Sequence, residues 1–530
     1  MKWTLLRILA VCLAVSLAFS GCGLLDFAGR FGMISFDKME YSRPDLSSLE
    51  GTLDDCLKSA AAGDDFEELT GYIMTLNMIF SDFYTNYLLA YVHYSIDLTD
   101  IYWETEYNYC VEKSPLIEGT MDKMLYALAD SPLREKLEHE DYFGEGYFDD
   151  YDGESIWTDA FTELMDQEAA LLNRYYDISS QALAVEMYSE EYYSVYGVQM
   201  EQVFVELVAL RQQIAAEAGY DSYPDFAYDF YYSRDYTPAQ ASAYIGDIEK
   251  ELVPLYRELD DSGIWENALR GSSEQQTFRY VKEMAAAMGG EIQEAFRLLE
   301  SRKLYHISYG ENKYNASFEV FLPNFMEPFI FMNPTMTNLD QLTFAHEFGH
   351  FCNDYASGGT GVGIDVAEIF SQGMEYLSLF YVDGASGLES MKMADSLCVY
   401  VEQAAYANFE ERVYGLNGET LTVESVRTLF GQTAYRYGFG SPQFDNRSYV
   451  TVGHFFTSPL YVISYVVSND AAMQLYQMEK TEAGAGLACY TANLATEQSD
   501  FLAFVKEAGL ESPFAEGRIQ SVKKTFESVL

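Results

Sequence analysis

The chain has 530 residues, of which 83 are acidic and 32 are basic, so its formal net charge is −51. This charge argues against nucleic acid as a partner, because phosphate backbones are bound through lysine and arginine. The length exceeds that of one ordinary domain, yet no low-complexity linker or internal repeat divides it. We therefore expect one large body.

The amino-terminal segment has the pattern of a signal peptide. An uncharged run from Ile8 to Phe19 follows two basic residues and is shorter than the roughly 20 residues of a membrane span. It leads into Ser20-Gly21-Cys22, which resembles a bacterial lipobox; the alternative is an ordinary cleaved signal with an incidental cysteine. We predict an extracytoplasmic, membrane-anchored bacterial lipoprotein, with residues 1–21 as signal peptide, a lipid on Cys22 and residues 22–44 as tether.

Helical periodicity dominates the next 250 residues. Apolar residues recur three and four apart from Leu46 to Leu299, which predicts helices. The segment Thr237-Pro238-Ala239-Gln240 has the spacing of a capping box and should begin a helix that runs to about Leu252, where Pro254 ends or kinks it. We expect an amino-terminal helical region, 45–200, and a second region, 201–530, that carries the chemistry.

Two short segments in the middle of the chain predict a β-hairpin. Residues Ala316–Leu322 and Pro328–Met332 are rich in aromatic and β-branched residues and are bounded by Pro and Asn. A sheet edge beside a catalytic centre can hold an extended peptide by backbone pairing. The hairpin is therefore either a rail for a peptide or a structural support for the helix that follows.

That helix is expected to begin near Thr337 and carries His346-Glu347-Phe348-Gly349-His350. Histidines four apart project from the same helix face, so both can reach one tetrahedral Zn²⁺ ion. Glu347 points aside and can take a proton from a water molecule that zinc polarises. The alternative is a pair of core histidines without a metal.

Zinc needs a third protein ligand. Cys352 is the nearest soft donor, but it should point to the opposite side of its helix. Glu368 follows the glycine-rich loop Ser357–Gly363 and shares a predicted helix face with Glu375. Because Asp365 and Glu368 also have the spacing of a capping box, Glu368 is either a metal ligand or a helix cap.

Three segments together resemble the oligoendopeptidase F and thimet oligopeptidase group of zinc metallopeptidases: Phe344–His350, Asp365–Glu375 and His454–Tyr465. With weaker echoes, such as Arg234-Asp-Tyr-Thr-Pro238, the likeness covers roughly residues 211–469. The resemblance implies a mainly helical fold with a deep substrate channel and a small hairpin or sheet beside the helix of the HExxH motif.

The resemblance also implies roles for individual residues. It makes Glu368 the third zinc ligand and Glu375 a partner that orients a ligand histidine, although Glu375 could equally be a solvated glutamate; Asp365 is expected to give similar support. His454 and one of two tyrosines, Tyr461 or Tyr465, are expected to stabilise the oxyanion, and the two tyrosines, four apart, are expected on one helical face. Those tyrosines have a competing interpretation as core aromatics.

The predicted function is that of a zinc-dependent endopeptidase, with Zn²⁺ as cofactor, that hydrolyses short unstructured oligopeptides. The mechanism is attack by a zinc-polarised water molecule with Glu347 as base. The alternative is a lipid-anchored peptide-binding or scaffold protein with a non-catalytic zinc cleft. The intact Glu347 favours the enzyme.

Overall fold

The structure is a computed structural model that describes residues 34–139, 142–151, 153, 155–261, 269–382, 386–440 and 444–530. The predicted signal peptide and Cys22 lie outside these residues. No helix within the described ranges is long and apolar enough to cross a membrane. No disulfide links the five described cysteines, Cys56, Cys110, Cys352, Cys398 and Cys489.

Long helices form the amino-terminal half and pack side by side, α4 on α5, α5 on α7 and α7 on α8. Asp65 and Asp100 begin two of them by accepting backbone N–H bonds in the first turns of α4 and α5. The helices are α3 (Leu49–Ala62), α4 (Phe66–Ile96), α5 (Ile101–Ala129), α6 (Arg134–Leu137), α7 (Asp159–Ala182), α8 (Val198–Glu217), α9 (Tyr223–Phe226), α10 (Pro238–Glu251) and α11 (Val253–Asp261).

The predicted capping box is confirmed at the start of α10. The Thr237 hydroxyl accepts a bond from the backbone N–H of Gln240, and the Gln240 side chain accepts one from the Thr237 N–H. The helix ends at Glu251, and Pro254 lies in the first turn of α11, where its missing N–H costs nothing.

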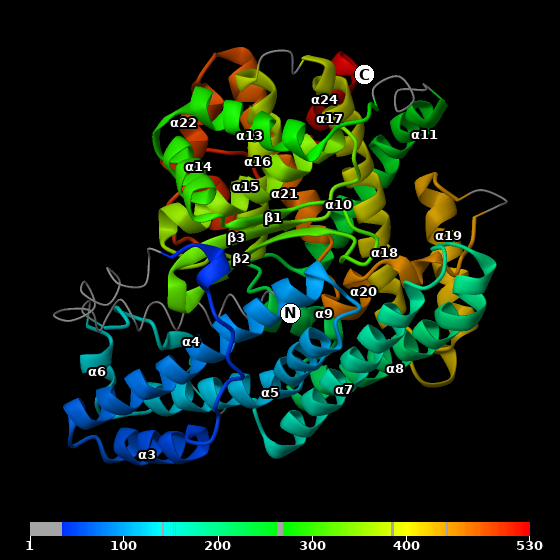
Figure 1. Cartoon of the computed structure of the whole chain (residues 1–530). Helices are drawn as coiled ribbons and strands as arrows, with labels where there is room; N and C mark the ends of the chain where they lie inside the picture. Colours follow the sequence, from blue (N-terminus) through cyan, green and yellow to red (C-terminus); the bar gives the residue numbers. More distant parts are fainter. Residues whose placement is uncertain are drawn as a thin grey trace.

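A three-stranded sheet lies in the middle of the molecule, with strands β1 (Tyr305–Ile307), β2 (Ser317–Leu322) and β3 (Glu327–Met332) in the order β1-β3-β2. Strands β2 and β3 form the predicted antiparallel hairpin, with Ser317 opposite Met332 and Leu322 opposite Glu327. Strand β1 pairs with β3 in parallel. In Figure 1 the sheet lies between α3, α4 and α5 below it and α13, α14, α15 and α16 above it.

The later helices include the central layer of the fold. Helix α15 packs on β2 and β3, and α16 packs between α15 and α21. These helices are α13 (Glu274–Met288), α14 (Gly290–Arg302), α15 (Leu339–Ser357), α16 (Ile364–Tyr381), α17 (Ser386–Cys398), α18 (Ala404–Tyr414), α19 (Val423–Tyr437), α20 (His454–Thr457), α21 (Ile463–Thr481), α22 (Ala485–Ala492), α23 (Phe501–Glu507) and α24 (Arg518–Val529).

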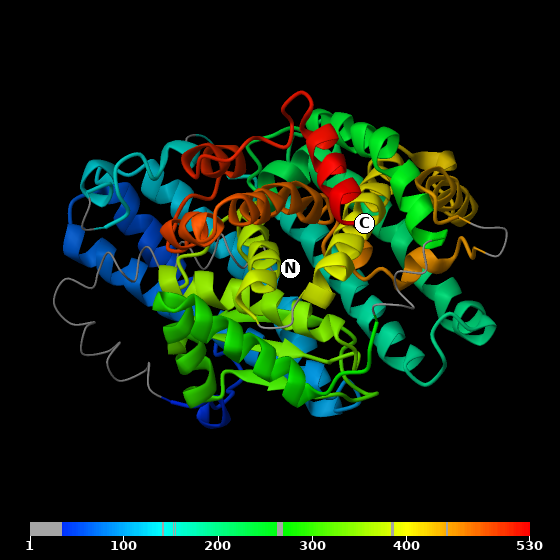
Figure 2. The same cartoon turned by 90° about the horizontal axis from the view of Figure 1, so that it is seen from above.

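Short 3-10 or π-helical turns complete the element list: η1 (Phe36–Lys38), η2 (Asp149–Tyr151), η3 (Tyr192–Gly197), η4 (Ala227–Tyr231), η5 (Pro323–Phe325), η6 (Val399–Gln403), η7 (Gly418–Thr420) and η8 (Ser448–Thr451). A hydrophobic cluster runs through the described chain from Met39 to Phe526. Viewed from above, the carboxy-terminal α24 lies against the yellow helices of the later half (Figure 2). The mainly helical fold with a small sheet is confirmed; the division at residue 200 and the deep channel stay predictions.

Candidate metal centre

The site is built where α15 and α16 approach each other unusually closely. A Cβ atom added to Gly349 would lie 2.4 Å from the carbonyl oxygen of Phe370 and 2.7 Å from Cα of Ser371. Only a glycine lets the two backbones come so near. The glycine within the HExxH motif therefore brings the two histidines of α15 to the side chains of α16.

Three ligand atoms converge at this contact. Nε2 of His346 lies 3.3 Å from Oε2 of Glu368, and Nε2 of His350 lies 3.7 Å from the same oxygen. The ligand atoms of all three residues lie within 4.8 Å of one another. Such a set of two imidazoles and one carboxylate is a common protein contribution to a catalytic zinc site, in which a fourth position stays open.

Glu368 is held as a carboxylate in a buried position, with 2% of its surface exposed. Burial alone would raise its pKa, but the neighbouring histidines and the Tyr461 hydroxyl outweigh burial and hold the pKa well below its usual range. Oε1 accepts a 2.6 Å bond from Tyr461, and Oε2 accepts a 2.8 Å bond from Ser371. The residue at the helix N-cap is Gly363, so the capping-box alternative for Glu368 is wrong.

Glu375 lies two turns further along α16 than Glu368 and contacts the first histidine. Its Oε1 is 2.8 Å from Nδ1 of His346, and its Oε2 accepts a 2.7 Å bond from Lys392 of α17. Lys392 is 1% exposed. Burial would raise the pKa of Glu375, but Lys392 and His346 lower it below its ordinary value. A bond to Nδ1 leaves Nε2 of His346 to face a metal.

Glu347 is 6% exposed and lies on α15 between the two histidines. Its charge reaches two tyrosines: burial raises the pKa of both Tyr465 and Tyr91, and Glu347 contributes to each increase. Tyr465 comes from α21 and Tyr91 from α4. The amino-terminal helices thus contribute a residue near the proposed base, although that region contains no motif that we could match.

The candidate oxyanion residues form an aromatic cluster. The ring of His454 lies 5.1 Å from that of Tyr461 and 5.9 Å from that of Tyr465. The expectation that both tyrosines share one helical face is wrong, because α21 begins at Ile463 and Tyr461 precedes it. Their hydroxyls differ accordingly: that of Tyr461 binds Glu368, and that of Tyr465 is 3.4 Å from Nε2 of His454.

Asp365 makes its contacts away from the ligand atoms. Its carboxylate accepts bonds from Nε of Arg234, at 3.3 Å, and from the hydroxyl of Tyr236, at 2.7 Å. Arg234 also donates to the carbonyl of Leu460 and to Ser464. Asp365 therefore supports Glu368 only indirectly, because its contacts fix the first turn of the helix that carries Glu368.

The glycine-rich loop before α16 has a backbone conformation that requires glycine at several positions. Gly358, Gly359 and Gly361 have φ angles of 67°, 74° and 71°, in the left-handed region that other residues rarely adopt. A Cβ atom on Gly359 would collide with the ring of Phe321 in β2. The loop therefore links α15, α16 and the sheet at fixed positions.

Several residues of the site were not predicted from the sequence. Lys392 and Ser371 bind the carboxylates of α16, and Arg234 connects α16 to the turn before Tyr461. The charge of Glu347 adds to the increase that burial causes in the pKa of Tyr91. Arg234 had a sequence signal, since it lies in a segment that weakly resembles the peptidase group. The others carry no local pattern that distinguishes them from structural residues.

Residues 36–154 match the family model of the Peptidase M3 N-terminal domain. No curated protein matches the chain in sequence.

Solved structures match nearly the whole chain. A crystal structure of a protein assigned as an oligoendopeptidase F has 20% identity and a TM-score of 0.83, covering 94% of this chain and 98% of that one. Pz peptidase A with an inhibitor has 20% identity and a TM-score of 0.82, covering 93% and 98%. A protein of Bacillus anthracis str. Ames, also assigned as an oligoendopeptidase F, has 22% identity and a TM-score of 0.79, covering 94% and 98%.

At this level of identity the solved structures establish a shared fold. The amino-terminal match is informative in a different way, because it covers the part of the chain in which sequence motifs were absent. The resemblance to the oligoendopeptidase F group is confirmed in the fold, and residues 36–154 add a match to the Peptidase M3 N-terminal domain.

Proposed function

We propose that the protein is a zinc-dependent endopeptidase that hydrolyses short, unstructured peptides. The observation that carries the proposal is the convergence of His346, His350 and Glu368, with Glu347 buried beside them. Spacing, burial and the bond from Glu375 to His346 together fit a catalytic zinc site better than a pair of structural histidines.

Zinc fits this donor set because it favours imidazole nitrogen and carboxylate oxygen in a tetrahedral arrangement. His346, His350 and Glu368 would hold the ion. When bound, the ion would polarise the attacking water molecule and the substrate carbonyl.

The protein side chains supply the remaining steps. Glu347 takes a proton from the attacking water and later gives it to the leaving amine, as a general base and then a general acid. Tyr465 and His454 lie close to each other and offer donors for the negative oxygen of the tetrahedral intermediate. Glu375 and Lys392 fix the orientation of His346 throughout.

Strand β2 is at one edge of the sheet and packs between α15 and α4. Its outer edge can pair with an extended peptide, which would align a substrate with α15. This position fits both interpretations of the hairpin, as a strand that binds a peptide and as a support for α15. We include peptide binding along β2 in the proposal.

The substitution Glu347→Gln tests the proposed mechanism. We expect it to retain zinc and to lower kcat by several orders of magnitude, because the amide can neither accept nor return the proton. Zinc content is measured by metal analysis, and products from a mixed peptide library are identified by mass spectrometry with and without a chelator. Glu67→Gln, at an exposed position of α4, is the matched control.

Near-normal turnover by Glu347→Gln would discard this mechanism. A wild-type protein that holds zinc and retains peptides without cleaving them would instead support the alternative function, a peptide-binding or scaffold protein.

The membrane anchor is a separate proposal that concerns residues outside the described ranges. We propose that Cys22 carries the lipid and holds the body at an extracytoplasmic membrane surface. The substitution Cys22→Ser should give soluble or unprocessed protein, while peptide hydrolysis by the body should not change. Membrane fractionation and fatty-acid labelling measure the loss of the anchor. An unlabelled, freely secreted wild-type chain would refute the anchor.

A further inference from the structure

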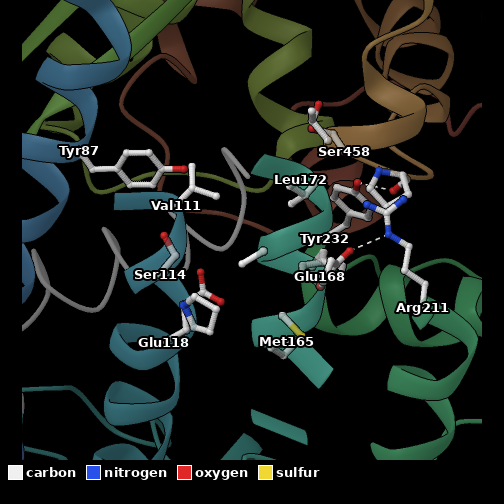
Figure 3. A pocket seen from close by; sticks show the side chains of 15 residues that line it. Tyr87, Val111, Ser114, Glu118, Met165, Glu168, Leu172, Arg211, Tyr232 and Ser458 are labelled. Carbon is white, nitrogen blue, oxygen red and sulfur yellow. Dashed lines mark hydrogen bonds and ion pairs between the residues drawn. The ribbon is translucent and has the colours of Figure 1, made fainter. Parts of the chain in front are cut away.

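A cavity of about 80 Å³ lies between the amino-terminal helices and the turn that precedes Tyr461 (Figure 3). This volume has room for several water-sized groups. Tyr87 of α4 and Glu118 of α5 lie on one side, and Glu168 of α7 and Ser458 lie on the other (Figure 3). The cavity therefore joins the region without sequence motifs to the segment that carries the candidate oxyanion residues.

One wall of the cavity packs against a tyrosine that binds a candidate metal ligand. The Tyr232 hydroxyl donates to the carbonyl of Pro459, and the Tyr232 ring lies 6.4 Å from the ring of Tyr461. Tyr461 in turn binds the ligand carboxylate of Glu368. Two tyrosines therefore connect the cavity wall to a candidate metal ligand.

The charges that line the cavity do not balance. Arg211 is 1% exposed, and its guanidinium binds Glu168 at 2.6 Å, the Tyr414 hydroxyl and the carbonyls of Phe455 and Phe456. Arg211 and Glu168 thus neutralise each other within the described structure. Among the described residues that line the cavity, Arg211 is the only cation, so the second carboxyl group, that of Glu118, has no counter-charge in this lining.

Glu118 extends from α5 towards the space that faces Met165 and Glu168 (Figure 3). Burial raises its pKa to about 8, so an isolated carboxylate is costly at this position. A cation in the cavity would remove that cost. The aromatic rings of Tyr87, Tyr231 and Tyr232 in the lining suit a cation as well, because the face of an aromatic ring attracts positive charge.

We propose that this cavity is a subsite for a primary ammonium group of the bound peptide, with Glu118 as its counter-charge. The proposal rests on the proposed peptidase function and specifies one feature of its substrates. The ammonium is either the amino terminus or a lysine side chain, and both present three N–H donors to Glu118 and to the hydroxyls of Tyr87 and Ser114. The large negative charge of the protein would also attract such peptides.

Binding to an inactive protein separates this subsite from catalysis. In the Glu347→Gln background, zinc-loaded protein is titrated with fluorescent peptides of one sequence that carry a lysine, a norleucine or an acetylated amino terminus. We expect loss of the relevant ammonium to weaken binding by about tenfold to hundredfold, the range for a charge-assisted hydrogen bond. Weaker binding of the norleucine peptide identifies a lysine side chain as the source of the ammonium, and weaker binding of the acetylated peptide identifies the amino terminus.

Glu118→Gln should abolish this discrimination, so that charged and uncharged peptides bind with a ratio near one. Glu112→Gln, at an exposed position of the same helix, should keep the wild-type ratio. Circular dichroism and thermal unfolding confirm that each variant is folded. The subsite proposal would be wrong if the protein that keeps Glu118 bound all the peptides equally. It would also be wrong if the Glu118→Gln protein still discriminated between charged and uncharged peptides.

Peptide cleavage by the wild type distinguishes failure of the ammonium subsite from failure of the proposed peptidase function. If peptides are cleaved but the ammonium has no effect on binding, the subsite alone is wrong. If no peptide is cleaved, the proposed function fails, and the binding ratios still decide whether Glu118 recognises an ammonium.

Discussion

At the scale of single residues, the structure gives different tasks to two tyrosines that looked equivalent in the sequence. The Tyr461 hydroxyl is 2.6 Å from Glu368, so it holds a candidate metal ligand. The Tyr465 hydroxyl lies 3.4 Å from Nε2 of His454, the other candidate oxyanion donor. Tyr465 is therefore the better candidate for the oxyanion donor, and Tyr461 is a positioning residue.

We expect Tyr461→Phe and Tyr465→Phe to fail in different ways. Loss of the bond to Glu368 should weaken zinc binding about tenfold to hundredfold, whereas kcat of the zinc-saturated Tyr461→Phe protein should change much less. Tyr465→Phe should retain zinc and lower kcat by roughly 10²-fold, the scale of one lost oxyanion donor. Competition with a zinc chelator and steady-state kinetics measure both quantities. Full activity in Tyr465→Phe would show that the donor lies elsewhere.

At the scale of elements, the site depends on how closely α15 and α16 approach each other. Gly349 permits this approach, and Glu368 reaches the histidines because of it. The atoms that an added methyl group would strike, Phe370 O and Ser371 Cα, belong to the backbone. A methyl group at position 349 can therefore be accommodated only if one of the two helices shifts, because moving a side chain would not remove the clash.

We expect Gly349→Ala to destabilise the fold by about 1–3 kcal/mol and to weaken zinc binding, because the helices must separate. Gly71→Ala is the matched control, since Gly71 also lies inside a helix but has nothing within 4 Å of the added methyl group. That variant should be more stable by about 0.5–1 kcal/mol. Urea unfolding and zinc titration measure both effects. Wild-type stability and zinc affinity in Gly349→Ala would contradict the close-approach argument.

At the scale of the whole molecule, the response to pH should depend on a few buried carboxyl groups and not only on the many acids at the surface. Burial raises the pKa of Glu410 to about 8, and the same holds for Glu118. Glu410 lies in α18 and accepts a 2.8 Å bond from the backbone N–H of Leu460, in the turn before Tyr461. A proton is therefore retained in the folded state at pH values where the unfolded chain releases it.

This difference predicts the sign of the pH dependence. The stability contributed by protonated Glu410 is complete below about pH 4.5, the ordinary value for glutamate, and is lost as the pH rises through about 8. Glu410→Gln keeps an acceptor for Leu460 but cannot ionise, so its stability should fall less between pH 5 and 8 than that of the wild type. Thermal unfolding at several pH values tests this, with the exposed Glu424→Gln as control. Parallel curves for wild type and Glu410→Gln would refute it.

The sequence by itself determined the features that arise within one element. The capping box at Thr237, the hairpin of β2 and β3, and the histidines four apart on α15 follow from local spacing, because turns, strands and helices set which neighbouring residues share a face. The mainly helical fold followed from the same periodicity. The family resemblance added Glu368, which spacing alone left open between a ligand and a cap.

Only the tertiary structure decided how separate elements meet. Lys392 reaches Glu375 from α17, Arg234 joins α16 to the turn at Leu460, and Glu118 faces Glu168 across a cavity. These pairs are far apart in the chain, and a buried charge with a partner has no local pattern that distinguishes it from a surface charge. The same reason explains the error about Tyr461: its place before α21 is set by the turn at Leu460, whose φ of 62° follows from contacts with distant residues.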